Sequence, residues 1–65
     1  MNYTLMRLSD DALDPIFISG KGENIPLYSN YLDDAFPFSD FKEAAHFCNE
    51  YGIEITDYQF KLLPF

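Results

Sequence analysis

The stretch "DFKEAAHFCNEYG", residues 40–52, predicts a single capped helix. Ser39 or Asp40 can cap its start, and with Asp40 as the cap, Glu43 occupies the reciprocal position of a capping box. Gly52 follows the last helical residue, where many helices end in a left-handed conformation. The sequence therefore predicts one helix here, with both of its ends defined by local signals.

The two faces of this helix differ in chemistry, because its apolar residues form one stripe on a helical wheel. The stripe contains Phe41, Ala44, Ala45, Phe47, Cys48 and Tyr51. The opposite face contains Lys42, Glu43, His46, Asn49 and Glu50. The lone histidine and the lone cysteine thus point to opposite sides, which argues against a nucleophile and base pair. We expect a solvated His46 and a Cys48 that behaves as a small hydrophobic residue.

Three segments upstream of the helix have the composition of strands. Residues 2–8 alternate, with Thr4, Met6 and Leu8 on one face and Tyr3, Leu5 and Arg7 on the other. Residues 15–20 predict a second strand, antiparallel to the first across an Asp-rich turn at residues 9–14. Residues 25–29 are a candidate third strand, which Pro26 restricts to the edge of a sheet.

The remaining segments are less regular. We expect residues 30–38 to form a loop whose Tyr31, Leu32, Ala35 and Phe36 turn toward the core. The tail from residue 53 predicts a last strand that contains a fault. Ile53 and Ile55 have odd parity, whereas Tyr58, Phe60 and Leu62 have even parity, so an unbroken strand would place the two sets on opposite faces. We therefore predict a bulge or turn at Thr56–Asp57.

These elements predict a single α+β domain over residues 1–65: a small, mainly antiparallel sheet of three or four strands in the order β-β-(β)-α-β. One helix, at about residues 40–51, would cover one face. The second strand has apolar groups on both sides, Ile16 and Ile18 against Phe17. The uncovered face should therefore expose apolar groups to a homodimer or a protein partner. The alternative is that residues 25–38 fold over that face.

Composition limits the chemistry of the chain. Of 65 residues, 48% are hydrophobic and 18% are Phe or Tyr, which argues against disorder. One cysteine permits no internal disulfide, and one cysteine with one histidine cannot assemble the usual zinc ligand sets. No set of residues has the arrangement of a catalytic centre. We expect no enzymatic activity, no metal and no cofactor.

Charge gives the clearest indication of a partner. Eleven Asp and Glu stand against four Lys and Arg, for a net charge of −7. Direct binding to nucleic acid or to an anionic membrane needs the opposite sign. We expect a partner protein with a basic surface. The chain has no long apolar run and no signal-peptide pattern at its start, so we expect a cytoplasmic location.

The acidic residues lie mostly in predicted connections and strand ends. Such a surface is open to two interpretations, a mimic of nucleic-acid phosphates or ordinary solubilising charge. As candidate protein-binding residues we take acidic groups together with two aromatic groups of the sheet. They are Asp10, Asp11, Asp14, Asp33, Asp34, Asp57, Tyr3 and Phe17.

Residues 35–55, "AFPFSDFKEAAHFCNEYGIEI", resemble a unit found in short phage and prophage accessory proteins. The matching positions are Phe38, Ser39, Glu43, Ala44, Gly52 and Ile53. This resemblance implies a protein that acts by stoichiometric binding, such as an anti-CRISPR or anti-restriction inhibitor located in the host cytoplasm. It implies no catalytic residue. The alternative is a small homodimeric structural or assembly protein without inhibitory activity.

Overall fold

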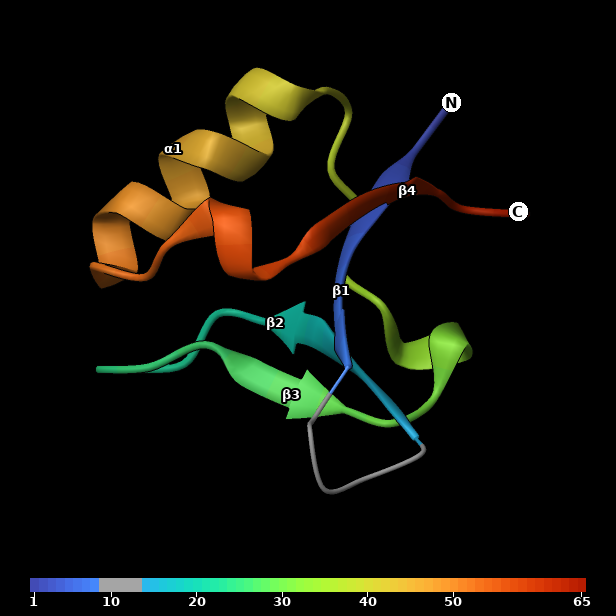
Figure 1. The fold of residues 1–65 in the computed structure, drawn as a ribbon, viewed down its shortest axis with the longest axis horizontal. Coiled ribbons are helices and arrows are strands. Elements are labelled where there is room, and N and C mark those ends of the chain that lie inside the picture. The colour runs from blue at the N-terminus through green and yellow to red at the C-terminus, as the bar shows by residue number, and fades with distance from the viewer. Residues whose placement is uncertain (9–13) are drawn as a thin grey trace.

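A four-stranded antiparallel sheet lies at the centre of the computed structural model, which describes residues 1–8 and 14–65 (Figure 1). The strand order is β3-β2-β1-β4. The bounds are β1 Tyr3–Leu8, β2 Pro15–Gly20, β3 Leu27–Ser29 and β4 Gln59–Leu62. The predicted α+β class is confirmed, and β3 is an edge strand as the position of Pro26 indicated. The turn expected at residues 9–14 falls outside the described residues except for Asp14.

The predicted division of side chains between the two faces of the sheet is confirmed. In the antiparallel pair of β1 and β2, Met6 stands opposite Phe17, so these two side chains share a face. Leu5 and Ile18 belong to a separate buried cluster, on the other face. Because residues alternate along a strand, each of these two central strands contributes to two apolar layers.

The one α-helix among the described residues, α1, spans Phe41–Tyr51 and has the caps that the sequence predicts. Asp40 is the N-cap, and its Oδ1 accepts a hydrogen bond of 2.8 Å from the backbone N–H of Glu43. The Glu43 carboxylate does not return to the N-cap backbone; its Oε2 accepts a 2.6 Å hydrogen bond from Ser39 Oγ. At the other end, Gly52 has φ 67°. Its N–H and that of Ile53 donate to carbonyls in the last turn, which ends the helix.

The helix packs one face against the sheet and leaves the other in solvent. The main buried cluster contains Leu5, Ile18, Phe38, Ala44, Phe47 and Cys48. Tyr51 is half-buried and packs against this cluster, Ala45 is half-buried, and His46 is exposed as predicted. Phe41, expected in the buried stripe, is 55% exposed, because it lies in the first turn, where its ring packs edge-on against Phe60 at the margin of the sheet.

The tail contains the predicted interruption. A 3-10 turn, η2, occupies Ile55–Asp57 and separates Gly52 from β4. The prediction of a turn at Thr56–Asp57 is confirmed, although the strand begins only at Gln59 and not directly after the helix. The turn resolves the parity fault, because residues before and after it pack against the same cluster. They are Ile53, Ile55, Tyr58 and Phe60.

The segment expected to be a loop is inserted between two strands. Direct pairing of β1 with β2 is limited to the pairs from Met6 with Phe17 to Leu8 with Pro15. Farther along, Tyr3 exchanges backbone hydrogen bonds with Phe38, and the Phe36 N–H donates to the Ile18 carbonyl at 2.8 Å. Residues 36–38 therefore occupy the gap where β1 and β2 diverge. Phe36 and Phe38 both join the helix-side cluster.

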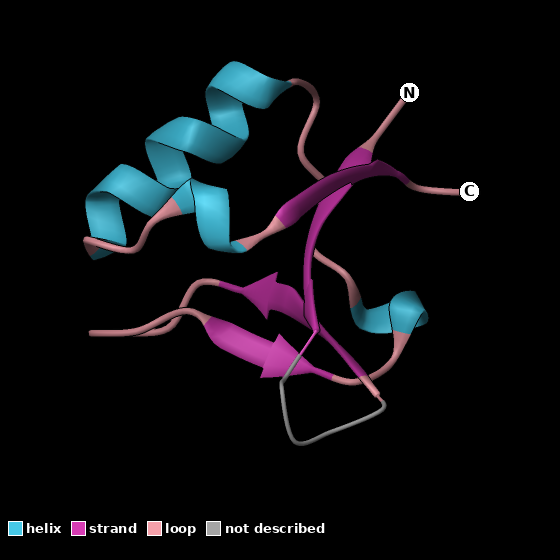
Figure 2. Ribbon diagram, viewed as in Figure 1, coloured by secondary structure: helices cyan, strands magenta, loops and turns pink. Residues whose placement is uncertain are grey.

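The opposite face of the sheet carries a second, smaller cluster of Phe17, Ala35 and Leu63, with Met6 packed against it. A short 3-10 turn, η1, at Leu32–Asp34 contacts β2 on this side. Figures 1 and 2 show η1 on the far side of β1 from α1. The structure thus favours the alternative in which residues 25–38 cover part of this face. Tyr31 and Leu32, expected in the core, are exposed, so that part of the prediction is wrong.

Candidate protein-binding surface

The acidic residues predicted to bind a partner are exposed wherever the structure describes them. Asp14, Asp33, Asp34 and Asp57 all lie on the surface, while Asp10 and Asp11 fall outside the described residues. Across residues 1–8 and 14–65, every Asp and Glu is exposed. This distribution follows from the cost of removing a carboxylate from water.

Only some of these carboxylates are gathered in one place. Ser29 Oγ donates a 2.8 Å hydrogen bond to Asp34 Oδ2, and Asn30 Nδ2 donates to the Pro15 carbonyl at 3.0 Å. These contacts hold η1 beside the start of β2, where Asp14 precedes Pro15. Asp57 lies in η2, which contacts α1 instead. The candidate acidic residues therefore divide between the two sides of the sheet.

Neither aromatic candidate is exposed, although the sequence-based prediction places both on the binding surface. Phe17 is 5% exposed beneath the cover of the second cluster, so the expectation that its ring is displayed is wrong. Tyr3 is half-buried and stacks on Phe60 with ring centroids 4.6 Å apart. Since Tyr3 pairs with Leu62 and Phe17 with Met6, these rings point to opposite faces and cannot form one contact patch.

The surface carboxylates are scarcely neutralised within the chain. Among the residues that the structure describes, the single ion pair joins His46 Nε2 to Glu50 Oε1 at 3.2 Å. No Lys or Arg lies within 4 Å of a described carboxylate. Arg7 instead places its guanidinium over the rings of Tyr28 and Tyr58, at 5.8 and 5.4 Å from their centroids. The acidic surface consequently keeps its negative field.

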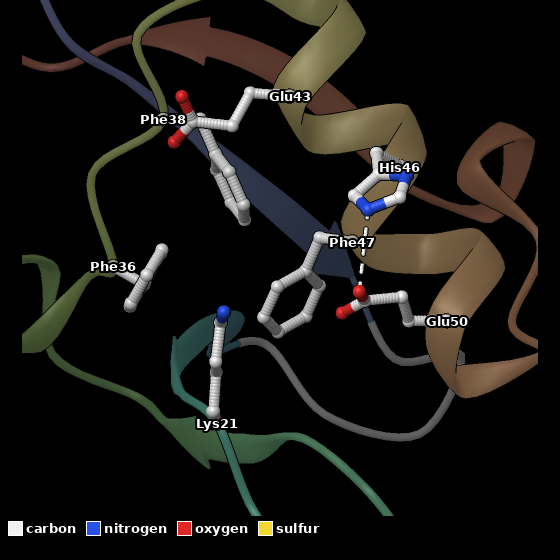
Figure 3. A pocket seen from close by; sticks show the side chains of 7 residues that line it. All are labelled: Lys21, Phe36, Phe38, Glu43, His46, Phe47 and Glu50. Carbon is white, nitrogen blue, oxygen red and sulfur yellow. Dashed lines mark ion pairs between the residues drawn. The ribbon is translucent and has the colours of Figure 1, made fainter.

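A hollow on the helix side was not predicted from the sequence. Its volume is about 230 Å³, and α1, residues 36–38 and the turn after β2 enclose it (Figure 3). The lining residues are Lys21, Phe36, Phe38, Glu43, His46, Phe47 and Glu50. The helical spacing of Glu43, His46 and Glu50 puts them on one edge of α1, which the sequence shows. The aromatic floor was not foreseeable, because it depends on the insertion of residues 36–38.

Local contacts fix the position of the turn that carries Lys21. The Tyr51 hydroxyl donates a 2.7 Å hydrogen bond to the Gly22 carbonyl and so joins the turn to the end of α1. A Cβ on Gly22 would overlap the Ile25 carbonyl oxygen, so only glycine fits this close approach. The result is that Lys21 stands beside the hollow, with its ammonium directed between the rings (Figure 3).

A second groove, of about 210 Å³, remains on the face that η1 partly covers. Its lining is mainly apolar, with Met6 and Phe17 from the sheet and Leu32 from η1. Thr4 also lines it, and its Oγ1 is buried without a hydrogen-bond partner among the described residues. This groove is the remnant of the bare apolar face that the sequence predicts.

The lone cysteine lies where the helical wheel places it. Cys48 is buried in the main cluster, and burial raises the pKa of its thiol. A raised pKa leaves little thiolate at neutral pH, which is the opposite of an activated nucleophile. Within residues 1–8 and 14–65, no group of three or more His, Cys, Asp or Glu side chains is placed to hold a metal ion.

No helix in the described part of the chain has the length and hydrophobicity needed to cross a bilayer. Comparison with protein-family models, with curated proteins and with solved structures found no match to this chain.

Proposed function

We propose that this protein acts by stoichiometric binding to a protein that presents a basic surface. The observation that carries the proposal is the exposed and unneutralised state of the described carboxylates. A net charge of −7 on 65 residues attracts a basic partner over roughly 10 Å at 0.1 M salt. Attraction of this kind raises the rate of encounter and selects partners by charge.

The partner class that fits best is a nucleic-acid-binding protein, because its basic surface is already suited to a row of negative groups. In this proposal the acidic turns compete with the phosphates for the same site. The resemblance of residues 35–55 to phage accessory proteins adds a context, the inhibition of a host defence protein in the host cytoplasm. This part rests on the resemblance and on charge, and it assigns no chemistry to the chain.

Capture from a bacterial lysate tests the proposal. Immobilised protein should retain a basic protein in about 0.1 M salt and release it as the salt approaches about 1 M, where the Debye length falls to about 3 Å. Duplex DNA should compete for the captured protein. Recovery of nothing at physiological salt, or of a complex that resists high salt, would overturn the proposal.

Two matched variants separate specific charges from net charge. Asp33→Asn removes an exposed carboxylate on η1 and should weaken capture. Glu54→Gln removes the same charge from an exposed position outside η1 and should weaken capture less. Equal losses in the two variants would attribute the effect to net charge and contradict a role for the η1 carboxylates.

A small homodimer is the second candidate function, and it has an observation of its own. β4 is an edge strand with one side unpaired in the sheet, and its Leu62 is 54% exposed. Strand pairing between two copies would extend the sheet. Two chains of net charge −7 repel each other, which favours a basic partner over a second copy. Light scattering distinguishes the two: a stable dimer that captures no partner supports the homodimer.

A further inference from the structure

The hollow beside α1 combines an aromatic floor with an acidic rim, a combination that suits one kind of ligand. We propose that it receives the cationic end of an arginine or lysine side chain of the basic partner. The identity of the protein that supplies this side chain rests on the proposed function, whereas the chemistry of the hollow does not depend on that function. At about 230 Å³ the hollow is smaller than the roughly 300–1,000 Å³ of small-molecule sites, so it fits a single side chain.

The floor consists of three phenylalanine rings that contact one another. The ring centroids of Phe36 and Phe38 are 5.1 Å apart, those of Phe38 and Phe47 5.3 Å, and those of Phe36 and Phe47 5.7 Å. The rings line the hollow together (Figure 3). Phe36 is half-buried, whereas Phe38 and Phe47 are only 0% and 3% exposed and form the buried wall behind it. The exposed face of an aromatic ring carries partial negative charge and attracts guanidinium and ammonium groups, so among the three rings a bound cation reaches Phe36.

The rim supplies full negative charge. Glu43 and Glu50 extend from the exposed side of α1 on either side of His46 (Figure 3). Ser39 and His46 each engage one oxygen of these carboxylates, Oε2 of Glu43 and Oε1 of Glu50. A carboxylate has about four acceptor positions, so both can still accept hydrogen bonds from a bound guanidinium.

Lys21 supplies a positive charge at the edge of the hollow. Its ammonium points between the rings, yet it forms no ion pair within 4 Å with a described carboxylate. Lys21 is an exposed residue of the lining, so its charge lies beside the place where the proposed ligand would bind. This charge repels a partner's cation, so Lys21 is an internal competitor that lowers the affinity. An anionic ligand would meet Lys21 but also both rim carboxylates, which repel it.

Titration of the isolated protein with a small probe tests the site without any partner. The probe is Nα-acetyl-arginine N-methylamide, whose only charge is the guanidinium, and the amide spectrum of ¹⁵N-labelled protein reports binding. We expect saturable shifts at Lys21, Phe38 and Phe47. The citrulline analogue, which has the same shape without the charge, should bind at least about fivefold more weakly. Absence of saturation, equal binding of citrulline, or preferential binding of acetate would overturn the proposal.

Variants locate the site and identify the competitor. Glu50→Gln should weaken the probe by roughly two- to fivefold, because it removes one rim charge from an exposed position. Lys21→Met should strengthen it by a similar factor. Lys42→Met changes the net charge equally but lies outside the lining, so it should have a much smaller effect. Equal gains from both lysine changes would attribute the effect to net charge and overturn the competitor role.

The two proposals fail in different ways. If the probe binds but no protein is captured from lysate, the hollow is a cation site and the proposed function is wrong. If a partner is captured whose affinity is insensitive to Glu50→Gln and Lys21→Met, the proposed function stands and the hollow is not its contact.

Discussion

Tyr3 and Phe38 exchange two backbone hydrogen bonds, of 2.7 and 2.8 Å, although they belong to opposite halves of the chain. This bridge fixes residues 36–38 in the gap between β1 and β2 and directs the Phe36 and Phe38 rings toward α1. The core and the floor of the hollow both depend on it. Changes in the inserted residues 36–38 should therefore affect both the stability of the protein and the proposed site.

Replacement of Phe38 should have the largest effect of any single truncation in this core. The side chain is 0% exposed, and Phe38→Ala should cost about 3–5 kcal/mol in free energy of unfolding. A chain of this size is stable by only roughly 3–10 kcal/mol, so Phe38→Leu provides a milder test. Urea denaturation followed by circular dichroism measures both. Phe65→Ala, at a 65% exposed position, is the control and should be neutral within about 0.5 kcal/mol.

Charges introduced on α1 should report its rotation. Ala44 is 0% exposed and Ala45 is half-buried. Ala44→Glu should therefore cost roughly 3–5 kcal/mol, and Ala45→Glu only about 1 kcal/mol. His46→Ala, on the solvent side, should change the unfolding free energy by less than about 0.5 kcal/mol. A reversed order of the two alanine variants in denaturation would mean that the helix is rotated from its position here.

Gly52 gives a test of backbone conformation without a change in packing. Its φ of 67° is left-handed, and a Cβ there would meet no atom within 4 Å. Gly52→Ala should thus lose about 1 kcal/mol from backbone strain alone, while Gly52→Asn should lose less, since asparagine tolerates this conformation. Equal stability of the alanine variant and the parent in thermal denaturation would contradict a left-handed C-cap.

Alkaline pH should destabilise the fold through two groups whose pKa values are raised. Burial raises the pKa of Cys48, and burial followed by the hydrogen bond to Tyr28 raises the pKa of Tyr58. For a group with a raised folded pKa, the stability it contributes is fully present below the unfolded pKa. That stability is lost as pH climbs from the unfolded value, about 8.5 for Cys and 10 for Tyr, toward the folded one.

Urea midpoints between about pH 8 and pH 10.5 should accordingly fall. The fall should be shallower in a Tyr58→Phe variant, which has no phenol to ionise. The Cys48 thiol should also react slowly with a thiol reagent in the native protein and rapidly in urea. A fast native reaction, or identical pH profiles for the parent and Tyr58→Phe, would contradict the burial of these groups.

Local signals account for the parts of the fold that the sequence predicts well. The Asp40 cap and the Gly52 terminus each involve hydrogen bonds to residues within one turn, so their partners are visible in the sequence. The strand at Pro15–Gly20 is likewise predicted with its correct bounds, because Pro15 and Gly20 delimit an apolar run. The parity change after Ile55 predicts a turn because no strand can reverse faces without one.

Contacts between distant residues account for the errors. Phe17 was expected on the surface, but the insertion of residues 36–38 brings Ala35 over it. Tyr31 and Leu32 were expected inside, but η1 lies at the edge of that cover and exposes them. The hollow was missed for the same reason, since its rings come from the inserted segment and from α1.

The amino-acid sequence alone predicts the class of the fold, the ends and orientation of the helix, the break before the last strand, and the strongly acidic surface. These properties depend on side-chain periodicity, on hydrogen bonds within a few residues and on net charge. The three-dimensional packing is needed to show which face is covered, that β1 and β2 diverge around Phe36 and Phe38, and that Lys21, Glu43 and Glu50 line one hollow. Those features arise from packing between segments that are far apart in the chain. The local pattern of the sequence does not indicate which of these segments will contact one another.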